Sequence, residues 1–240
     1  MVYSEKFYVG YSDINRRFGL SNASIMRVFE NIACMHSSAV GCGMMDTDAR
    51  WFLTAYHIKI HKRPHYEERV TVNTWSKEIK GFLAAREYEI YSEDGTLAVT
   101  ANSNWTYING QTGKVERVPK ETVEAFQSEK DKTNFDVVKL PKLKECTEYI
   151  IEREFYVDRN FIDVNNHMNN VCYLELANLV LPEEVYEQAA CDEFEIMYRK
   201  AVPYGETVKC LYGETEDSYV VAIKSQDLSE LHAVVKFYKK

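Results

Sequence analysis

The sequence lacks long apolar runs and paired cysteine motifs. No stretch approaches the roughly 20 apolar residues of a membrane-spanning helix, and residues 1–6 lack the apolar core of a signal peptide. None of the six cysteines forms a CxxC pair, which argues against a zinc site or a redox motif. A chain of 240 residues can bury a large core without disulfides. We therefore expect a cytoplasmic protein with reduced cysteines and no bound metal.

Basic residues are also in deficit. The chain has 29 Lys and Arg against 37 Asp and Glu, a net charge of −8, whereas non-specific nucleic-acid binding needs a basic surface. We expect no nucleic-acid partner. Hydrophobic residues make up 45% and aromatic residues 13%, with 17 Tyr. This composition is typical of a globular protein rich in sheet.

The first half predicts a strand, a long helix and an antiparallel sheet. Residues 3–10 read as a strand, and Ser21 or Asn22 begins a helix with one apolar stripe. From residue 52 the apolar period changes to two, and Asp94-Gly95 and Asn109-Gly110 are hairpin signals. The expected strands are 52–62, 69–77, 82–91 and 96–108, followed by a short helix from Pro119 to Gln127.

The second half repeats this order. A strand at 149–157 and a helix at 170–179 precede strands at 194–200, 207–212, 219–224 and 232–238. Short identities support a duplication. They are Asp13-Ile14-Asn15 with Asp163-Val164-Asn165 at an offset of 163 − 13 = 150, Tyr66 with Tyr204 at 204 − 66 = 138, and Leu97 with Leu231 at 231 − 97 = 134. We expect an α+β fold with an N-terminal unit at 1–128, a linker at 129–148 and a C-terminal unit at 149–240.

The segment 163–171 carries the clearest chemical signal, because six of its nine residues are Asp, Asn or His. Such residues also form turns and helix caps, so a purely structural loop is the alternative. His167 is the side chain here whose usual pKa suits a general base. The offset of 150 places Arg17 opposite His167, so one half alone would hold the imidazole. That asymmetry favours catalysis in the second half and substrate binding in the first.

The sequence resembles the acyl-acyl carrier protein thioesterase family, the plant fatty acyl enzymes and their bacterial relatives. The resemblance covers nearly the whole chain from about Phe7. It is carried by a DxNxHxNN pattern at Asp163, Asn165, His167, Asn169 and Asn170, and by Trp51-Phe52-Leu53-Thr54, Asn73-Thr74-Trp75, Asn104-Trp105-Thr106-Tyr107 and Tyr198-Arg199-Lys200. It implies a tandem (double) hotdog, in which two antiparallel sheets each wrap a long central helix. It also implies hydrolysis of fatty acyl groups from acyl carrier protein without a cofactor.

By the same resemblance, Asp163, Asn165 and His167 are the catalytic residues. His167 would activate water, Asp163 would assist the imidazole or orient the water, and Asn165 would hold the thioester. Plant relatives carry Glu-Cys where this chain has Ala201 and Val202. Whether Glu195, Glu206 or no residue replaces that glutamate stays open. We expect direct attack by water, with Cys172 as a packing residue.

In the first unit, the resemblance implies an acyl tunnel. Candidate substrate-binding residues are Met26, Phe29 and Trp51, although a core role is the simplest interpretation of the helix positions. Basic residues that could guide an acidic carrier protein are Lys59, Lys62, Arg63, Arg199 and Lys200. The histidines at 57, 61 and 65 do not predict a metal site, because four residues of strand span about 13 Å.

Three other functions compete with this hypothesis. An acyl-CoA thioesterase would use the same scaffold and would prefer CoA thioesters. A dehydratase would need a histidine and an acidic residue from opposing halves, and Arg17 in place of a first-half imidazole argues against it. A non-catalytic acyl-binding module would bind acyl chains and release no thiol. The oligomeric state, monomer or homodimer, stays open at this point.

Overall fold

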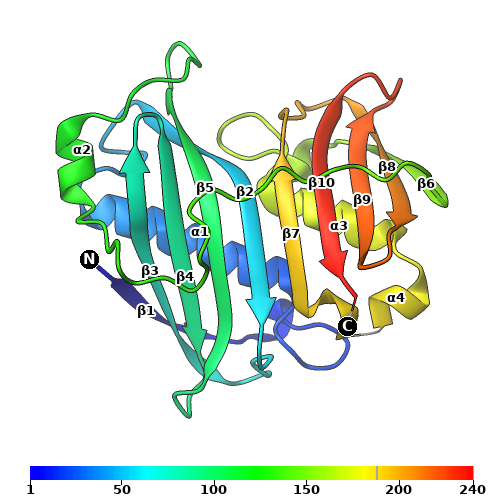
Figure 1. The fold of residues 1–240 in the computed structure, drawn as a ribbon, viewed down its shortest axis with the longest axis horizontal. Helices are drawn as coiled ribbons and strands as arrows, with labels where there is room; N and C mark the ends of the chain where they lie inside the picture. Colours follow the sequence, from blue (N-terminus) through cyan, green and yellow to red (C-terminus); the bar gives the residue numbers. More distant parts are fainter. Residues whose placement is uncertain (188, 240) are drawn as a thin grey trace. The chain divides into compact units, whose positions relative to one another are not determined.

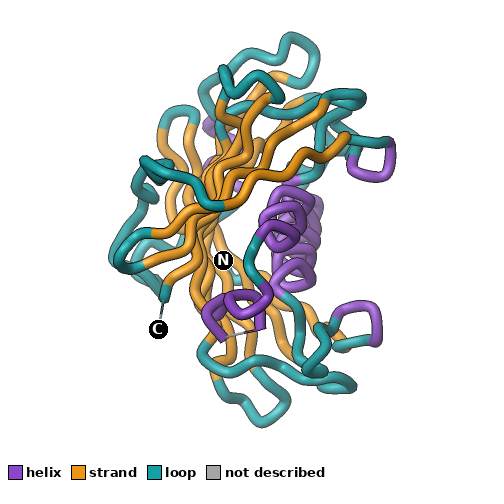
Figure 2. The backbone as a smooth tube through the Cα atoms, turned by 90° about the vertical axis from the view of Figure 1, so that its right-hand side faces the viewer, coloured by secondary structure: helices purple, strands orange, loops and turns teal. Residues whose placement is uncertain are grey.

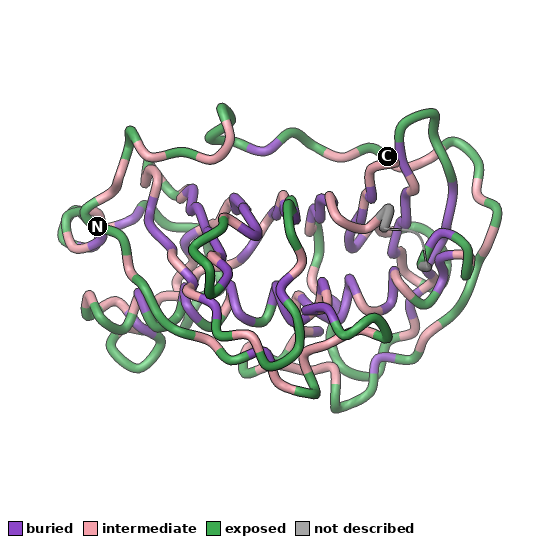
Figure 3. Tube along the Cα trace, turned by 90° about the horizontal axis from the view of Figure 1, so that it is seen from below, coloured by how far each residue is buried: buried purple, intermediate pink, exposed green. Residues whose placement is uncertain are grey.

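The computed structural model describes residues 1–187 and 189–239. The chain divides into two compact units, Met1–Leu140 and Pro141–Lys240. Each unit pairs one antiparallel sheet with a helix on one of its faces (Figures 1 and 2). Buried residues follow the strands and helices, while turns and loops are exposed (Figure 3). No described helix is both long enough and apolar enough to cross a membrane.

The first unit has five strands in the order β1-β3-β4-β5-β2, all antiparallel neighbours. They are β1 (Tyr3–Tyr8), β2 (Ala49–Ile60), β3 (Arg69–Lys80), β4 (Leu83–Tyr91) and β5 (Leu97–Asn109). Helix α1 (Asn22–Ala39) packs on this sheet, and α2 (Lys120–Ala125) follows it. Ser21 caps α1, since its side chain accepts the Ser24 N–H at 3.1 Å. A short 3-10 helix, Tyr11–Asp13, precedes α1.

The second unit has the same layout with shorter strands, in the order β7-β10-β9-β8-β6. They are β6 (Ile151–Tyr156), β7 (Glu193–Tyr198), β8 (Thr207–Glu214), β9 (Ser218–Ser225) and β10 (Leu231–Tyr238). Helix α3 (Asn170–Val180) packs on the sheet. The short helix α4 (Glu183–Glu187) and the 3-10 helices Arg159–Phe161 and Ala189–Asp192 complete the unit. No periodic pattern predicted α4, which is a five-residue helix.

Matching backbone features confirm that the two units are repeats, but they correct one offset. Asn15 N–H donates to Gly19 O at 2.8 Å, and Asp163 N–H donates to His167 O at 2.9 Å. The equivalent residues of this loop are therefore 148 apart, not 150. The residue of the first unit that corresponds to His167 is Gly19. The expectation that Arg17 would occupy this position was wrong. The shared Asp-x-Asn letters lie two residues out of structural register.

The offset of 138 between Tyr66 and Tyr204 agrees with the backbone. The following residues, Glu67 and Gly205, both have positive φ, at 67° and 89°. Val9 N–H donates to Glu68 O and Val157 N–H donates to Glu206 O in the same way. The two sheets therefore share their turn geometry as well as their strand order.

The segment 129–148, which we call the strap, lies on the sheet faces that point away from α1 and α3. In its first part, Lys132 O accepts a hydrogen bond from the Trp75 indole N–H, and the Asn134 N–H donates to the Glu87 carboxylate. In the second unit, Leu143 and Cys146 pack on a buried cluster of Met197, Val220 and Val234. The green and yellow-green trace in Figure 1 shows this course. The residues expected to form a linker are thus divided between the two units.

Candidate active site

The loop between Phe161 and α3 is a tight hairpin. Ile162 pairs with Met168, and the Asp163 N–H to His167 O bond closes the next pair. Asn166 adopts the left-handed conformation with φ of 61°, which asparagine tolerates better than most residues. Phe18 has φ of 60° at the equivalent position of the first unit. The backbone of this loop is therefore built the same way in both units, and the side chains differ.

Asp163 and His167 stand opposite each other in this hairpin. Opposed residues of an antiparallel pair send their side chains to the same face, with Cβ atoms about 5 Å apart. The Asp163 carboxylate accepts the Asn165 N–H at 2.8 Å and the Asn165 side-chain amide at 3.4 Å. All three predicted catalytic residues are partly buried. The fold thus brings a carboxylate, an amide and an imidazole to one short loop.

The two nitrogens of His167 differ in their surroundings. Nδ1 is buried and has no hydrogen-bond partner among the described residues. Nε2 is not one of the atoms that are both buried and unbonded. In a neutral ring one nitrogen carries the proton and the other accepts. Nε2 is therefore the ring nitrogen that water can reach, and it can act as a base when the ring proton is on Nδ1.

Tyr173 also belongs to the site, and the sequence analysis missed it. Its hydroxyl accepts the Val202 N–H at 3.2 Å, and it is 2% exposed. Burial, aided by the nearby Cys172 and Asp163, raises the pKa of Tyr173. The phenol therefore stays neutral. The equivalent residue of the first unit is Ile25. A tyrosine in place of isoleucine on a buried helix face was the sequence signal that could have identified Tyr173.

The N-terminus of α3 follows directly. Asn169 caps the helix by accepting the Val171 N–H at 2.9 Å. The Tyr198 hydroxyl donates to Asn170 O at 3.0 Å and ties the start of the helix to β7. The positive end of the helix therefore lies next to the loop, where it favours negative charge.

The segment 201–203 lies beside the loop, but it brings no carboxylate or thiol. His167 pairs with Pro203, and the Met168 N–H donates to Val202 O at 2.8 Å. Glu195 accepts from the Tyr238 hydroxyl at 2.7 Å. Cys172 is 9% exposed, with its sulfur 3.9 Å from Phe161 O. The positions of the Glu-Cys pair themselves, Ala201 and Val202, carry neither a carboxylate nor a thiol.

The first unit has no comparable constellation at its loop. The repeat positions of Asp163, Asn165 and His167 are occupied by Asn15, Arg17 and Gly19. A Cβ atom at Gly19 would lie 2.6 Å from the Arg63 side chain, so Arg63 fills the space beside it. Arg63 also donates to Asn22 Oδ1 at 2.9 Å.

The predicted substrate-binding residues lie inside the first unit. Met26 and Phe29 on α1 are fully buried, and Phe29 packs on Tyr88 with ring centroids 4.6 Å apart. Trp51 on β2 is partly buried and lies edge-on to Tyr107 at 4.9 Å. These placements fit a core role and do not by themselves assign substrate contacts.

Several of the histidines and basic residues singled out in the sequence make contacts within their own unit. His57 packs on Phe135 with ring centroids 4.5 Å apart, and His61 Nε2 lies 3.0 Å from Thr100 Oγ1. Within the described residues, no three His, Cys, Asp or Glu side chains are grouped as a metal site would require. Of the basic residues, Lys62 pairs with Asp94 at 2.8 Å and Lys200 pairs with Glu230.

Comparisons with solved structures show the same fold. An acyl-ACP thioesterase from Bacteroides thetaiotaomicron superposes with a TM-score of 0.87 at 20% identity, covering 99% of this chain and 98% of that one. The 12:0-ACP thioesterase from Umbellularia californica gives 0.84 at 18% identity, covering 99% and 97%. The fold is therefore the double hotdog that the sequence predicted.

Sequence comparisons agree. The chain is 24% identical to the chloroplastic oleoyl-acyl carrier protein thioesterase 1 of Arabidopsis thaliana, over 90% of this chain and 65% of that protein. It thus spans just under two thirds of that relative. Residues 1–126 match the acyl-ACP thioesterase N-terminal domain, and residues 144–236 match the C-terminal domain. These matches show that the chain belongs to the acyl-ACP thioesterase family.

Proposed function

We propose that this protein hydrolyses the thioester of fatty acyl-acyl carrier protein and releases a free fatty acid. The observation that carries the proposal is the loop of the second unit, where the Asp163 carboxylate and the His167 imidazole lie opposite each other. The chain that carries this loop matches the acyl-ACP thioesterase family. The named relatives are thioesterases and hydrolases of acyl carrier protein substrates.

His167 acts as the general base in this proposal. Nε2 accepts a proton from water, whose oxygen attacks the thioester carbonyl, while Nδ1 retains its proton. The negative charge of Asp163 on the same face stabilises the imidazolium that forms. Asn165, held by Asp163 through two hydrogen bonds, offers its amide to the thioester group.

The developing oxyanion needs donors. The dipole of α3 favours negative charge beside its first turn, and one oxyanion donor contributes roughly 3 kcal/mol in other acyl-transfer enzymes. The tetrahedral intermediate then expels the thiolate, which takes up a proton. No cysteine is required, which agrees with the packed position of Cys172.

The test is a thiol-release assay with carrier-protein thioesters of increasing chain length and matched CoA thioesters. Removing a general base typically costs about 10²- to 10⁴-fold in rate. We therefore expect His167→Ala to lose kcat on that scale and to unfold at the same temperature as the wild type. His65→Ala, an exposed imidazole of the first unit, is the control and keeps full activity.

Each alternative gives a different result. A preference for CoA thioesters would identify an acyl-CoA thioesterase. Tight binding of acyl chains without thiol release would identify a binding module. A folded His167→Ala protein with near-normal kcat would remove the general-base assignment, and a trapped acyl-cysteine would remove direct attack by water.

We also propose that the protein works in the cytoplasm, as a monomer or a homodimer. All six cysteines are free, which supports a reducing compartment. Light scattering on the purified chain measures its mass in solution and separates the two states.

A further inference from the structure

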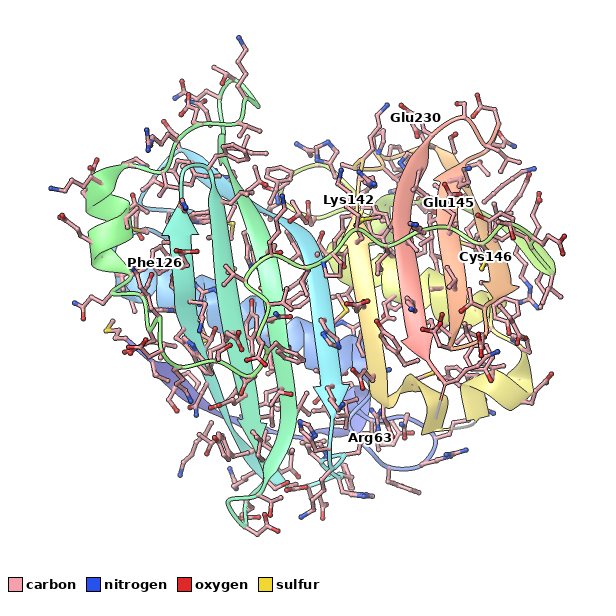
Figure 4. All side chains as sticks on the ribbon, viewed as in Figure 1. Arg63, Phe126, Lys142, Glu145, Cys146 and Glu230 are labelled. Carbon is pink, nitrogen blue, oxygen red and sulfur yellow. The ribbon has the colours of Figure 1, made fainter. Side chains whose placement is uncertain are left out.

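A cation is buried inside the first unit without a carboxylate partner. Arg86 on β4 is 7% exposed. Its Nη1 lies 3.0 Å from Nδ1 of His36 on α1 and 3.0 Å from Oγ1 of Thr74. No carboxylate of a described residue bonds to it, including that of Glu30 on α1. Phe126, labelled at the end of α2 in Figure 4, lies against both side chains.

This arrangement is unusual because a buried charge is costly unless it is paired. Burial lowers the pKa of Arg86, but an arginine side chain remains charged in proteins. Its two recorded hydrogen bonds both use Nη1. Nε and Nη2 bond to no described residue, and they are not among the fully buried unbonded atoms, so this edge of the guanidinium is accessible. The edge formed by these two nitrogens is one on which a carboxylate binds with two parallel hydrogen bonds.

His36 provides a second donor. Because arginine can only donate, Nδ1 of His36 accepts from Arg86, and the ring proton therefore sits on Nε2. Nε2 is buried and has no acceptor in the described part of the chain. Burial and the charge of Arg86 lower the pKa of His36 to about 3, so the ring is neutral and this tautomer is retained.

Aromatic rings and hydroxyls surround the pair. The Phe126 ring lies 5.6 Å from the Arg86 guanidinium and 5.3 Å from the His36 ring, edge-on. The Tyr88 hydroxyl accepts from Tyr56 at 3.1 Å and from Ser103 at 3.2 Å. The rings and hydroxyls named here are hydrogen-bonded or apolar and form no ion pair with Arg86.

We propose that Arg86 and His36 form a binding site for a carboxylate carried on an aliphatic chain. The carboxylate occupies the open guanidinium edge, and Nε2 of His36 donates a further hydrogen bond. Two sources share this chemistry: the far carboxyl of an ω-carboxyacyl thioester, and the carboxyl of a free fatty acid that enters the unit. The first source rests on the proposed thioesterase function, and the second does not.

The first arm compares three acyl carrier protein thioesters of equal chain length, ending in a carboxylate, its methyl ester or a methyl group. We expect the wild type to favour the carboxylate over the methyl ester by about 30-fold in kcat/KM, since buried charged hydrogen bonds are worth at least that much. The second arm measures binding of a free fatty acid, its methyl ester and an α,ω-diacid to the full chain by calorimetry.

The variants are Arg86→Met, which removes the charge at similar volume, and Arg86→Lys, which keeps the charge without the fork. Both lose the preference for the carboxylate, Arg86→Met completely. Arg69→Met is the matched control, because it removes one positive charge from the surface of the same unit. It keeps the preference.

The outcomes separate the two sources and the two proposals. A carboxylate preference in the first arm identifies the ω-carboxyacyl substrate. Tighter, Arg86-dependent binding of the free acid alone identifies the released product. If no thioester is cleaved, the proposed function fails, while diacid binding still tests the site. The site is refuted if the wild type shows no preference for a carboxylate over its methyl ester in either arm, a result that needs no folded variant.

Discussion

Three side chains distinguish the two copies of the loop that precedes the long helix. Asp163, Asn165 and His167 stand where the first unit has Asn15, Arg17 and Gly19, although the backbone hydrogen bonds are the same. The sequence singled out these three residues through the family resemblance and because histidine suits base catalysis, and their catalytic role stays a prediction. The repeat register could not be predicted, since matching letters do not report which backbone groups pair.

The buried Arg86 and His36 were also hidden from sequence reasoning. In a strand of alternating residues such as β4, arginine usually marks the exposed face. Here Tyr88 packs on α1 and Arg86 bonds to His36 of that helix, while Glu87 and Glu89 bond to the strap. Both faces of β4 thus carry buried charged side chains. Hydrophobic periodicity cannot predict this, because it assigns charged residues to an exposed face.

His36 makes stability depend on pH. Its pKa in the folded chain is about 3, against an ordinary 6.5. The unfolded chain therefore takes up a proton below pH 6.5 that the folded chain refuses until about pH 3, and stability falls as the pH drops through this window. The cost is about 1.4 kcal/mol per pH unit.

Urea denaturation of wild type and His36→Gln at pH 7 and pH 5 measures this effect. Glutamine keeps an acceptor for Arg86 and does not titrate. We expect the wild type to lose about 2 kcal/mol more than the variant on acidification. Equal losses would show that His36 is protonated in the folded state.

At the scale of elements, hydrophobic period and turn residues predicted every long helix and strand, with ends shifted by a few residues. Strand β2 runs over Ala49–Ile60 where 52–62 was expected, because pairing with β5 continues through Arg50 and Trp51. Asp94-Gly95 is the predicted turn, with Gly95 at φ of 81°. The register shifts in β2 and β3 had no sequence signal.

The cap of α3 links an element to the site. Asn169 accepts the Val171 N–H, and its own N–H donates to Phe161 O at 2.8 Å. Replacing such a cap by alanine typically costs about 1 kcal/mol. We expect Asn169→Ala to lose this much stability and also to lower kcat, because the cap positions the loop that holds His167.

Asn169→Asp should restore both quantities, since aspartate caps as well as asparagine. Ser21→Ala, the equivalent cap of α1, is the matched control. It should lose similar stability and keep kcat. A loss of kcat in both alanine variants would mean that general destabilisation, not loop position, limits turnover.

At the scale of the whole molecule, the strap changes how the chain is divided. Its charged, weakly periodic sequence predicted a linker, yet much of it is fastened to the sheets. Asn104 donates to Val138 O at 2.8 Å and accepts the Leu140 N–H at 2.7 Å. Many of these bonds use strap backbone groups, which every sequence shares, so composition cannot reveal them.

In the second unit the strap is held by close approach and by charge. A Cβ atom at Gly213 of β8 would lie 2.5 Å from Glu148 O, and Glu145 pairs with Lys224 at 3.1 Å. Figure 4 labels Glu145 and Cys146 along this course. The two parts of the strap therefore have separate anchors, one set in each unit.

Separate anchors predict separate opening. Asn104→Ala should speed amide hydrogen exchange in residues 129–140 alone, because it removes two hydrogen bonds, worth about 1–2 kcal/mol together. Gly213→Ala should speed exchange in residues 141–148 alone, because the added methyl group displaces Glu148. Glu93→Gln, in an exposed turn outside the strap, is the control. If either substitution released the whole strap, residues 129–148 would be a single cooperative unit that joins the two sheets, and the boundary at Leu140 would not separate independent openings.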